Sequence, residues 1–135
     1  MKVFISHSHK DEALAKKVAT ILQEDGLDVW DENEILPGEN WAEKIAQALN
    51  ESKAMIVLLT PEALQSRWVQ YEIEYALTKK SYSHRLFPVV IGTPQEIPND
   101  SIPWILRRFK LMNFSEQSKI EEGIKEIAQT LKQSE

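Results

Sequence analysis

The chain has 135 residues, of which 42% are hydrophobic, so it is long enough for one domain with one buried core and too short for two. Its 16 Lys and Arg against 21 Asp and Glu give a net charge of −5, which argues against nucleic acid as the main partner. It contains no cysteine, which excludes disulfides, thiolate catalysis and cysteine-ligated zinc.

No apolar run approaches the roughly 20 residues of a membrane span. The N-terminus enters its first apolar pattern directly, without a basic segment followed by a long apolar stretch. We therefore predict a cytoplasmic protein with no membrane partner.

Apolar runs alternate with segments of helical periodicity along the chain. A strand is predicted at residues 3–5, followed by a helix from Asp11 to about Gly26, where the glycine is placed as a C-terminal stop. A short second strand covers residues 28–31 and leads into a polar loop, residues 32–40.

The next helix begins near Trp41, with Ile45 and Leu49 on its apolar face. It is followed by six consecutive apolar residues, 54–59, which predict a strand covered on both faces in the centre of a parallel sheet. A helical stretch is then predicted from residue 60 to about residue 80.

The remaining strands are predicted at residues 86–91 and 109–114. Between them, residues 92–108 are expected to be irregular with one helical turn, because three prolines interrupt them. The last helix carries an inner apolar stripe that consists of Ile120, Ile124, Ile127 and Leu131. Five strands alternating with helices predict a single doubly wound α/β domain, residues 1–135, with a parallel sheet and helices on both faces.

In such sheets, ligands bind beyond the carboxyl ends of the strands, at the point where the strand order reverses. In the common order 2-1-3-4-5, this point lies between strands one and three. The residues expected there are Ser6, His7, Ser8, Thr60 and Pro61.

These residues argue against several familiar functions. A phosphoacceptor site needs an acidic pair after strand one and an Asp after strand three, where this chain has Ser6, His7 and Thr60. The four glycines are too widely spaced for a Walker or dinucleotide-binding loop, and no glycine-rich elbow surrounds any serine. His7 and His9 have no further ligand cluster in the sequence, so no metal site is predicted.

The helix after the third strand carries a more informative pair. Its predicted buried stripe consists of Val69, Ile73, Ala76 and Leu77. At about 100° per residue, Trp68, Glu72 and Tyr75 lie together about 90° to one side, which predicts Glu72 at the edge of the core. Two interpretations remain open: a solvated carboxylate beside a boundary tryptophan, or a carboxylate and an aromatic wall that project together into a site.

Three segments resemble, in the right order, the signature motifs of bacterial TIR (Toll/interleukin-1 receptor) domains, and a fourth segment resembles one of their strands. Residues 4–11, Phe-Ile-Ser-His-Ser-His-Lys-Asp, resemble the first motif, and residues 31–41 resemble the BB loop. Residues 66–72 resemble the Trp-x-x-x-Glu helix of the NAD-consuming members, and residues 86–90 their fourth strand. The resemblance spans the chain and implies a flavodoxin-like fold, in agreement with the pattern of strands and helices.

The resemblance also implies a NAD+ nucleosidase of bacterial anti-phage immunity, which releases nicotinamide and either ADP-ribose or a cyclic isomer. Glu72 is implied as the catalytic residue, in contact with the hydroxyls of the nicotinamide ribose during an oxocarbenium-like transition state. Nicotinamide in NAD+ is already a cationic leaving group, so one carboxylate suffices. NAD+ would be the substrate, and no further cofactor and no metal are implied.

Four substrate-binding side chains follow from the same resemblance. Trp68 would wall the pocket, Trp41 would lie against a ring of the dinucleotide, and His7 and Asp31 would line the crevice. Trp41 fits the apolar stripe of its own helix as well, and that interpretation stays open.

Residues 24–43 contain eight acidic side chains and no basic one, an unfavourable field for a pyrophosphate. The substrate therefore needs cations from Lys10, from Arg67 or from the basic surface of a neighbouring copy. Domains of this type associate through the BB loop, which corresponds here to Glu34, Leu36, Pro37 and Gly38, so other TIR domains are implied partners. An ordinary mixed-charge surface accounts for the same residues equally well.

A different function is a non-catalytic TIR adaptor, or an effector module that acts by association with other TIR domains. Glu72 together with Trp68 favours the enzyme, because adaptor members of the family generally lack that carboxylate.

Overall fold

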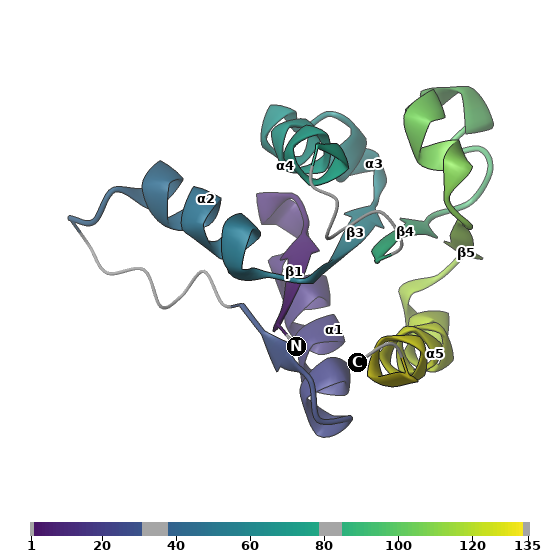
Figure 1. Cartoon of the computed structure of the whole chain (residues 1–135). Coiled ribbons are helices and arrows are strands. Elements are labelled where there is room, and N and C mark those ends of the chain that lie inside the picture. The colour runs from purple at the N-terminus through teal and green to yellow at the C-terminus, as the bar shows by residue number, and fades with distance from the viewer. Residues whose placement is uncertain (1, 31–37, 79–84, 134–135) are drawn as a thin grey trace.

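The computed structural model describes residues 2–30, 38–78 and 85–133, except for the side chain of Trp41. Within these ranges the strands are β1 (Lys2–Ser6), β2 (Asp28–Val29), β3 (Ala54–Leu59), β4 (Leu86–Ile91) and β5 (Met112–Phe114). They form a parallel sheet in the order β2-β1-β3-β4-β5 (Figure 1), which confirms the predicted fold class and strand order.

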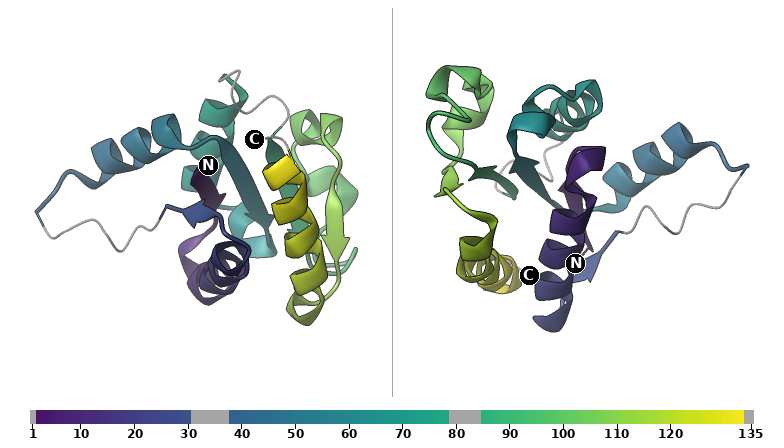
Figure 2. Two further views of the ribbon diagram at one scale, coloured as in Figure 1. Left: turned by 60° about the horizontal axis from the view of Figure 1, so that its bottom comes forward. Right: turned by 180° about the vertical axis from the view of Figure 1, so that it is seen from behind.

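The helices are α1 (Glu12–Glu24), α2 (Trp41–Glu51), α3 (Pro61–Leu64), α4 (Arg67–Leu77) and α5 (Ile120–Gln133). Short 3-10 helices are η1 (His9–Asp11), η4 (Asn99–Ser101), η5 (Trp104–Arg108) and η6 (Gln117–Lys119). Helices α1 and α5 lie side by side on one face of the sheet, and α2, α3 and α4 cover the other (Figure 2). No helix of the described ranges is both long and apolar enough to cross a membrane.

Each face of the sheet has its own hydrophobic core. Val3 packs into the core under α1 and α5, which we call the α1–α5 core, and Ile5 packs against it. Phe4, between them in the sequence, packs into the core under α2, α3 and α4, which we call the α2–α4 core. Because successive side chains of a strand point to opposite faces, Ser6 faces the same side as Phe4. This alternation positions the polar end of β1 against α4.

The predicted single helix from residue 60 to residue 80 is wrong, because the structure divides it into α3 and α4. Helix α3 ends at Leu64, and Ser66 has an extended backbone with φ −87° and ψ 117°. The Ser66 hydroxyl accepts a hydrogen bond from the backbone N–H of Val69 at 3.2 Å. This cap satisfies one of the free N–H groups at the start of α4, so the helix begins anew just before Trp68.

The last strand is shorter than predicted, since β5 covers Met112–Phe114 and not residues 109–114. The backbone N–H of Gly92 donates to Phe114 O at 2.9 Å, so the backbone groups of every second residue before it in β4 also point toward β5. Pro88, four residues before Gly92, is at one of these positions. Proline has no N–H to donate, and the ladder therefore has no bond at that level. The segment before β5 contains two 3-10 helices, η4 and η5, where one helical turn was expected.

Candidate functional site

The reversal of strand order lies between β1 and β3, as predicted. Ser6, the last residue of β1, is aligned with Val57 in β3, and β2 pairs with the other edge of β1. The crevice of this fold, meaning the space beyond the carboxyl ends of β1 and β3, is therefore bordered by the residues that follow these two strands.

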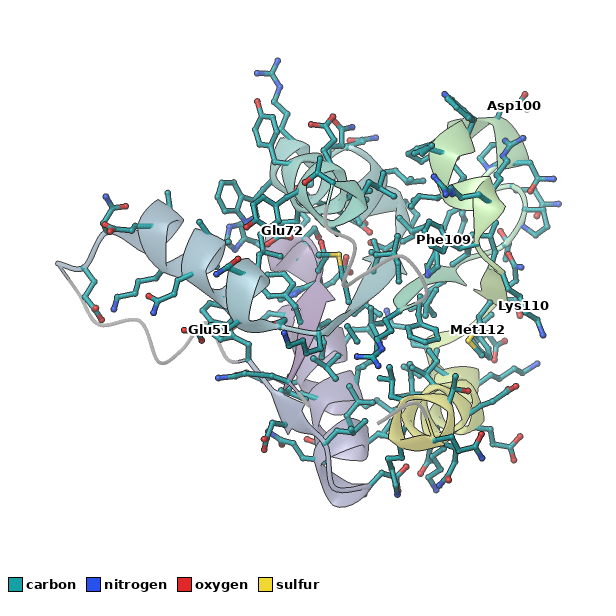
Figure 3. The ribbon with its side chains drawn as sticks, in the orientation of Figure 1. Glu51, Glu72, Asp100, Phe109, Lys110 and Met112 are labelled. Carbon is teal, nitrogen blue, oxygen red and sulfur yellow. The ribbon has the colours of Figure 1, made fainter. Side chains whose placement is uncertain are left out.

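Glu72 is directed at this point from α4. Its side chain is only 3% exposed, and its Oε1 atom accepts a hydrogen bond from the Ser6 hydroxyl at 2.7 Å. Figure 3 shows Glu72 between α4 and the end of β1. Glu72 thus lies inside the α2–α4 core and not at its edge, because Val69, Ile73 and Ala76 on the same helix are buried with it.

Trp68 lies one helical turn before Glu72 and is partly buried. It packs against the α2–α4 core, as Tyr75 one turn further along also does. Residues at i and i+4 share one side of a helix, so the aromatic side chain and the carboxyl group of α4 belong to the same surface. The structure therefore places Trp68 and Glu72 on one side of α4, as predicted from their spacing.

His7 takes a different direction. It is partly buried, and its Nδ1 atom lies 3.3 Å from the backbone oxygen of Ile5. It lines a cavity of about 300 Å³ between one side of α1 and residues Ile5, Val29 and Trp30. Glu72 is not among the residues that line this cavity.

Several predicted site residues lie outside the described residues. They are Asp31, proposed for substrate binding, and Glu34, Leu36 and Pro37 of the predicted assembly loop. Trp41 is the first residue of α2, and its side chain is likewise not described. Gly38 is exposed, with a φ of 90° that suits a glycine turn. Lys10 and Arg67, the nearby candidates for cations, are both exposed.

A second buried carboxyl group, that of Asp11, ties the loops after β1 and β3 together. Its Oδ2 atom accepts hydrogen bonds from the Ser8 hydroxyl, at 2.9 Å, and from the Thr60 hydroxyl. Thr60 Oγ1 in turn accepts from the backbone N–H of Ala63 at 3.1 Å and caps α3. Asp11 is only 7% exposed, so this network is buried where the segments after β1 and β3 meet.

The roles of Ser6 and Asp11 in this site are not predicted by the motifs of the sequence. Ser6 alternates with the apolar Phe4, and a serine at a core-facing position of a strand is a signal that a polar partner faces it. The role of Asp11 has no such signal, because its partner Thr60 lies 49 residues away. In the described part of the chain, no three His, Asp or Glu side chains are grouped so that they could hold a metal ion.

Comparisons with known proteins identify similar chains. The family model described as a TIR domain matches residues 3–128. The 2′ cyclic ADP-D-ribose synthase BtTIR of Bacteroides thetaiotaomicron is 28% identical over 101 residues, which cover 73% of this chain and 34% of that protein. The NAD(+) hydrolase TcpA of Theionarchaea archaeon (strain DG-70-1) is 32% identical over 97 residues, which cover 70% of this chain and 30% of that protein.

A receptor is similar as well. Human Toll-like receptor 6 is 29% identical over 107 residues, which cover 74% of this chain and 13% of the receptor. Among solved structures, the TIR domain of the Toll-related receptor TRR-2 from Hydra magnipapillata superposes with a TM-score of 0.69 at 17% identity, covering 92% of this chain and 91% of that chain. The chain spans about a third or less of the length of these curated relatives.

Proposed function

This chain belongs to the TIR domain family, and from that premise we propose that it is a NAD+ nucleosidase, which cleaves the bond between nicotinamide and ribose. The observation that carries the proposal is the Glu72 carboxyl group, which lies at the carboxyl end of β1 one turn after Trp68. The similar proteins named as a cyclic ADP-ribose synthase and a NAD+ hydrolase support this chemistry.

The proposed reaction begins with departure of nicotinamide, which takes the electron pair of the glycosidic bond and leaves as a neutral base. Positive charge then develops on the ribose, and the nearby Glu72 carboxylate stabilises it. Attack by water, with loss of a proton, gives ADP-ribose. Attack by a nucleophile on the other half of the same molecule gives a cyclic isomer. NAD+ is the substrate, and the proposal needs no additional cofactor.

The direct test is incubation of the purified chain with NAD+, followed by chromatography of the nucleotides. We expect free nicotinamide together with ADP-ribose or a cyclic isomer. Because the proposed reaction consumes NAD+, it fits the cytoplasmic location and the role in anti-phage defence that we propose from the sequence.

The alternative is a non-catalytic domain that acts by association with other TIR domains. The similarity to Toll-like receptor 6 supports this alternative. An adaptor or effector of this kind would bind other TIR domains and leave NAD+ intact. Unchanged NAD+ at protein concentrations where scattering detects oligomers would favour this alternative over the enzyme.

The burial of Glu72 gives a reason to connect catalysis with association. At 3% exposure the carboxyl group is not accessible to a dinucleotide until neighbouring groups move. We propose that contact with a second copy, through the segment that includes Glu34 and Pro37, orders an accessible pocket. At the described end of this acidic segment, Glu39 forms a partly exposed ion pair with Lys44 at 3.0 Å.

Association predicts that NAD+ consumption per molecule rises with protein concentration. We expect Pro37→His, or the charge reversal Glu34→Lys, to suppress this rise. Salt should weaken the contact once the screening length falls below about 10 Å, because the acidic segment interacts through charge. Turnover and light scattering measured on the same samples, over a series of protein and salt concentrations, check this prediction. A constant specific activity over a wide dilution series, with monomer throughout, would contradict the association model.

Trp68 is predicted to steer the product. Its flat ring beside Glu72 can exclude water and hold the adenosine half of the substrate near the ribosyl cation. We therefore expect a detectable cyclic product, and we expect Trp68→Ala to shift the product ratio toward linear ADP-ribose more than it lowers total cleavage. Mass-resolved chromatography measures both quantities.

The control for this variant is Trp104→Ala, because Trp104 is 79% exposed and lies in η5. We expect it to change neither the product ratio nor the melting temperature. If Trp68 only packs α4 against the sheet, its removal should cost about 3–5 kcal/mol and reduce both products in parallel. An unchanged product ratio with a lowered melting temperature would rule out the steering role.

A further inference from the structure

The hydrogen bond between Ser6 and Glu72 joins two elements that are distant in sequence. Ser6 is the last residue of β1 and is fully buried, and Glu72 lies in the second turn of α4. The distance from Ser6 Oγ to Glu72 Oε1 is 2.7 Å. This length is that of a well-formed hydrogen bond from a hydroxyl to a carboxyl oxygen.

The single proton of the Ser6 hydroxyl is committed to this bond. An ionised carboxylate is an acceptor only, so Ser6 must be the donor. Burial disfavours an ionised carboxyl group unless donors compensate for the lost water, and Ser6 supplies such a donor. The same bond restricts the rotation of the Glu72 side chain, because it fixes one of the two carboxyl oxygens against β1.

We propose that Ser6 is a positioning residue for the reaction: it holds the Glu72 carboxylate in the orientation and charge state that cleavage requires. This inference rests on the proposed NAD+ cleavage. Ser6 itself contacts no substrate, because its side chain is sealed between β1 and α4. It acts through Glu72 alone.

The chain offers a matched control for this role. Ser52 is also buried, at 1% exposure, and its hydroxyl also forms a 2.7 Å hydrogen bond. Its acceptor is the backbone oxygen of Ala48 at the end of α2, and not a carboxyl group. Removal of the Ser52 hydroxyl therefore has the structural cost of a lost buried hydrogen bond without any effect on Glu72.

The experiment compares Ser6→Ala, Ser6→Cys and Ser52→Ala in the full chain. We expect Ser6→Ala to lower kcat about 10- to 100-fold, the range for a hydrogen bond to a charged group, with little change in KM. Ser6→Cys keeps a weak donor on a slightly larger side chain, so it should recover part of the loss. Ser52→Ala should leave kcat unchanged even where it lowers the melting temperature.

A second measurement does not depend on turnover. With carbon-13 in the glutamate carboxyl groups, the signal of Glu72 is assigned by its absence in Glu72→Gln. We expect Ser6→Ala to shift this signal and Ser52→Ala to leave it in place. If the signal shifts but the wild-type chain does not cleave NAD+ at concentrations where scattering detects oligomers, the proposed reaction is refuted and the contact is confirmed. An active Ser6→Ala variant with wild-type kcat would overturn the positioning role and leave the proposed reaction intact.

Discussion

Glu72→Gln is expected to lower NAD+ consumption by at least about 100-fold and to leave the fold intact. The amide has nearly the shape of the carboxyl group, and its oxygen can still accept the hydrogen bond from Ser6. It carries no negative charge, however, so it cannot stabilise the cation that develops on the ribose. Loss of one such electrostatic group typically lowers kcat by about 10²- to 10³-fold.

The control for this variant is Glu74→Gln in the same helix. Glu74 is exposed, whereas Glu72 is buried. The two substitutions remove the same charge from α4, so only a local role of Glu72 separates their effects. Turnover and melting temperature should be measured for both. If Glu72→Gln unfolds at the wild-type temperature and retains wild-type turnover, the proposed chemistry is wrong.

Asp11→Ala is expected to have the largest effect on stability. The substitution leaves the hydroxyls of Ser8 and Thr60 without their shared acceptor at buried positions. A buried polar group without a partner costs about 1–3 kcal/mol, so we expect the free energy of unfolding to fall by about 3 kcal/mol. Urea unfolding monitored by tryptophan fluorescence measures the change.

Asp100→Ala is the corresponding control, since Asp100 is exposed in η4 (Figure 3). Its free energy of unfolding should stay within about 0.5 kcal/mol of the wild-type value. If Asp11→Ala also changes the free energy of unfolding by no more than about 0.5 kcal/mol, water replaces the carboxylate as acceptor. The hydrogen bonds of Asp11 would then not be needed to hold the segments after β1 and β3 together.

The central strands were predictable to the residue. Residues 54–59 and 86–91 are apolar runs without charged residues, and they form β3 and β4 with the predicted bounds. A strand buried on both faces leaves this signal in the sequence because each of its side chains must be apolar. The alternation of strands with helices predicts a parallel sheet with helices on both faces, and the strand order assumed for it, the common order 2-1-3-4-5, is the one observed.

The boundary between α3 and α4 could not be predicted from periodicity. The apolar spacing continues through Gln65 and Ser66, and neither residue is a proline or glycine. The break depends on the Ser66 hydroxyl, which bonds to a backbone N–H three residues later in place of water. This competition between a side chain and the helical backbone leaves only a weak mark in the sequence.

The candidate site was predictable in part. The spacing of Trp68 and Glu72 identified a shared side of one helix, which the structure confirms. The burial of Glu72 depends on the hydroxyl of Ser6, 66 residues earlier, and on the direction in which β1 ends. Contacts of this range arise only from the assembled sheet, so they cannot be obtained from local patterns.

The sheet separates the two hydrophobic cores, so the sequence of one core can evolve without altering the packing of the other. Ser6, Trp68 and Glu72 all face the α2–α4 core, whereas the packing between α1 and α5 lies behind the sheet. Substitutions that repack Val18 or Ile124 alter stability without touching the groups that carry the proposed chemistry. Adaptation to a hotter or colder habitat can therefore proceed in one half of the molecule while selection on the reaction acts in the other.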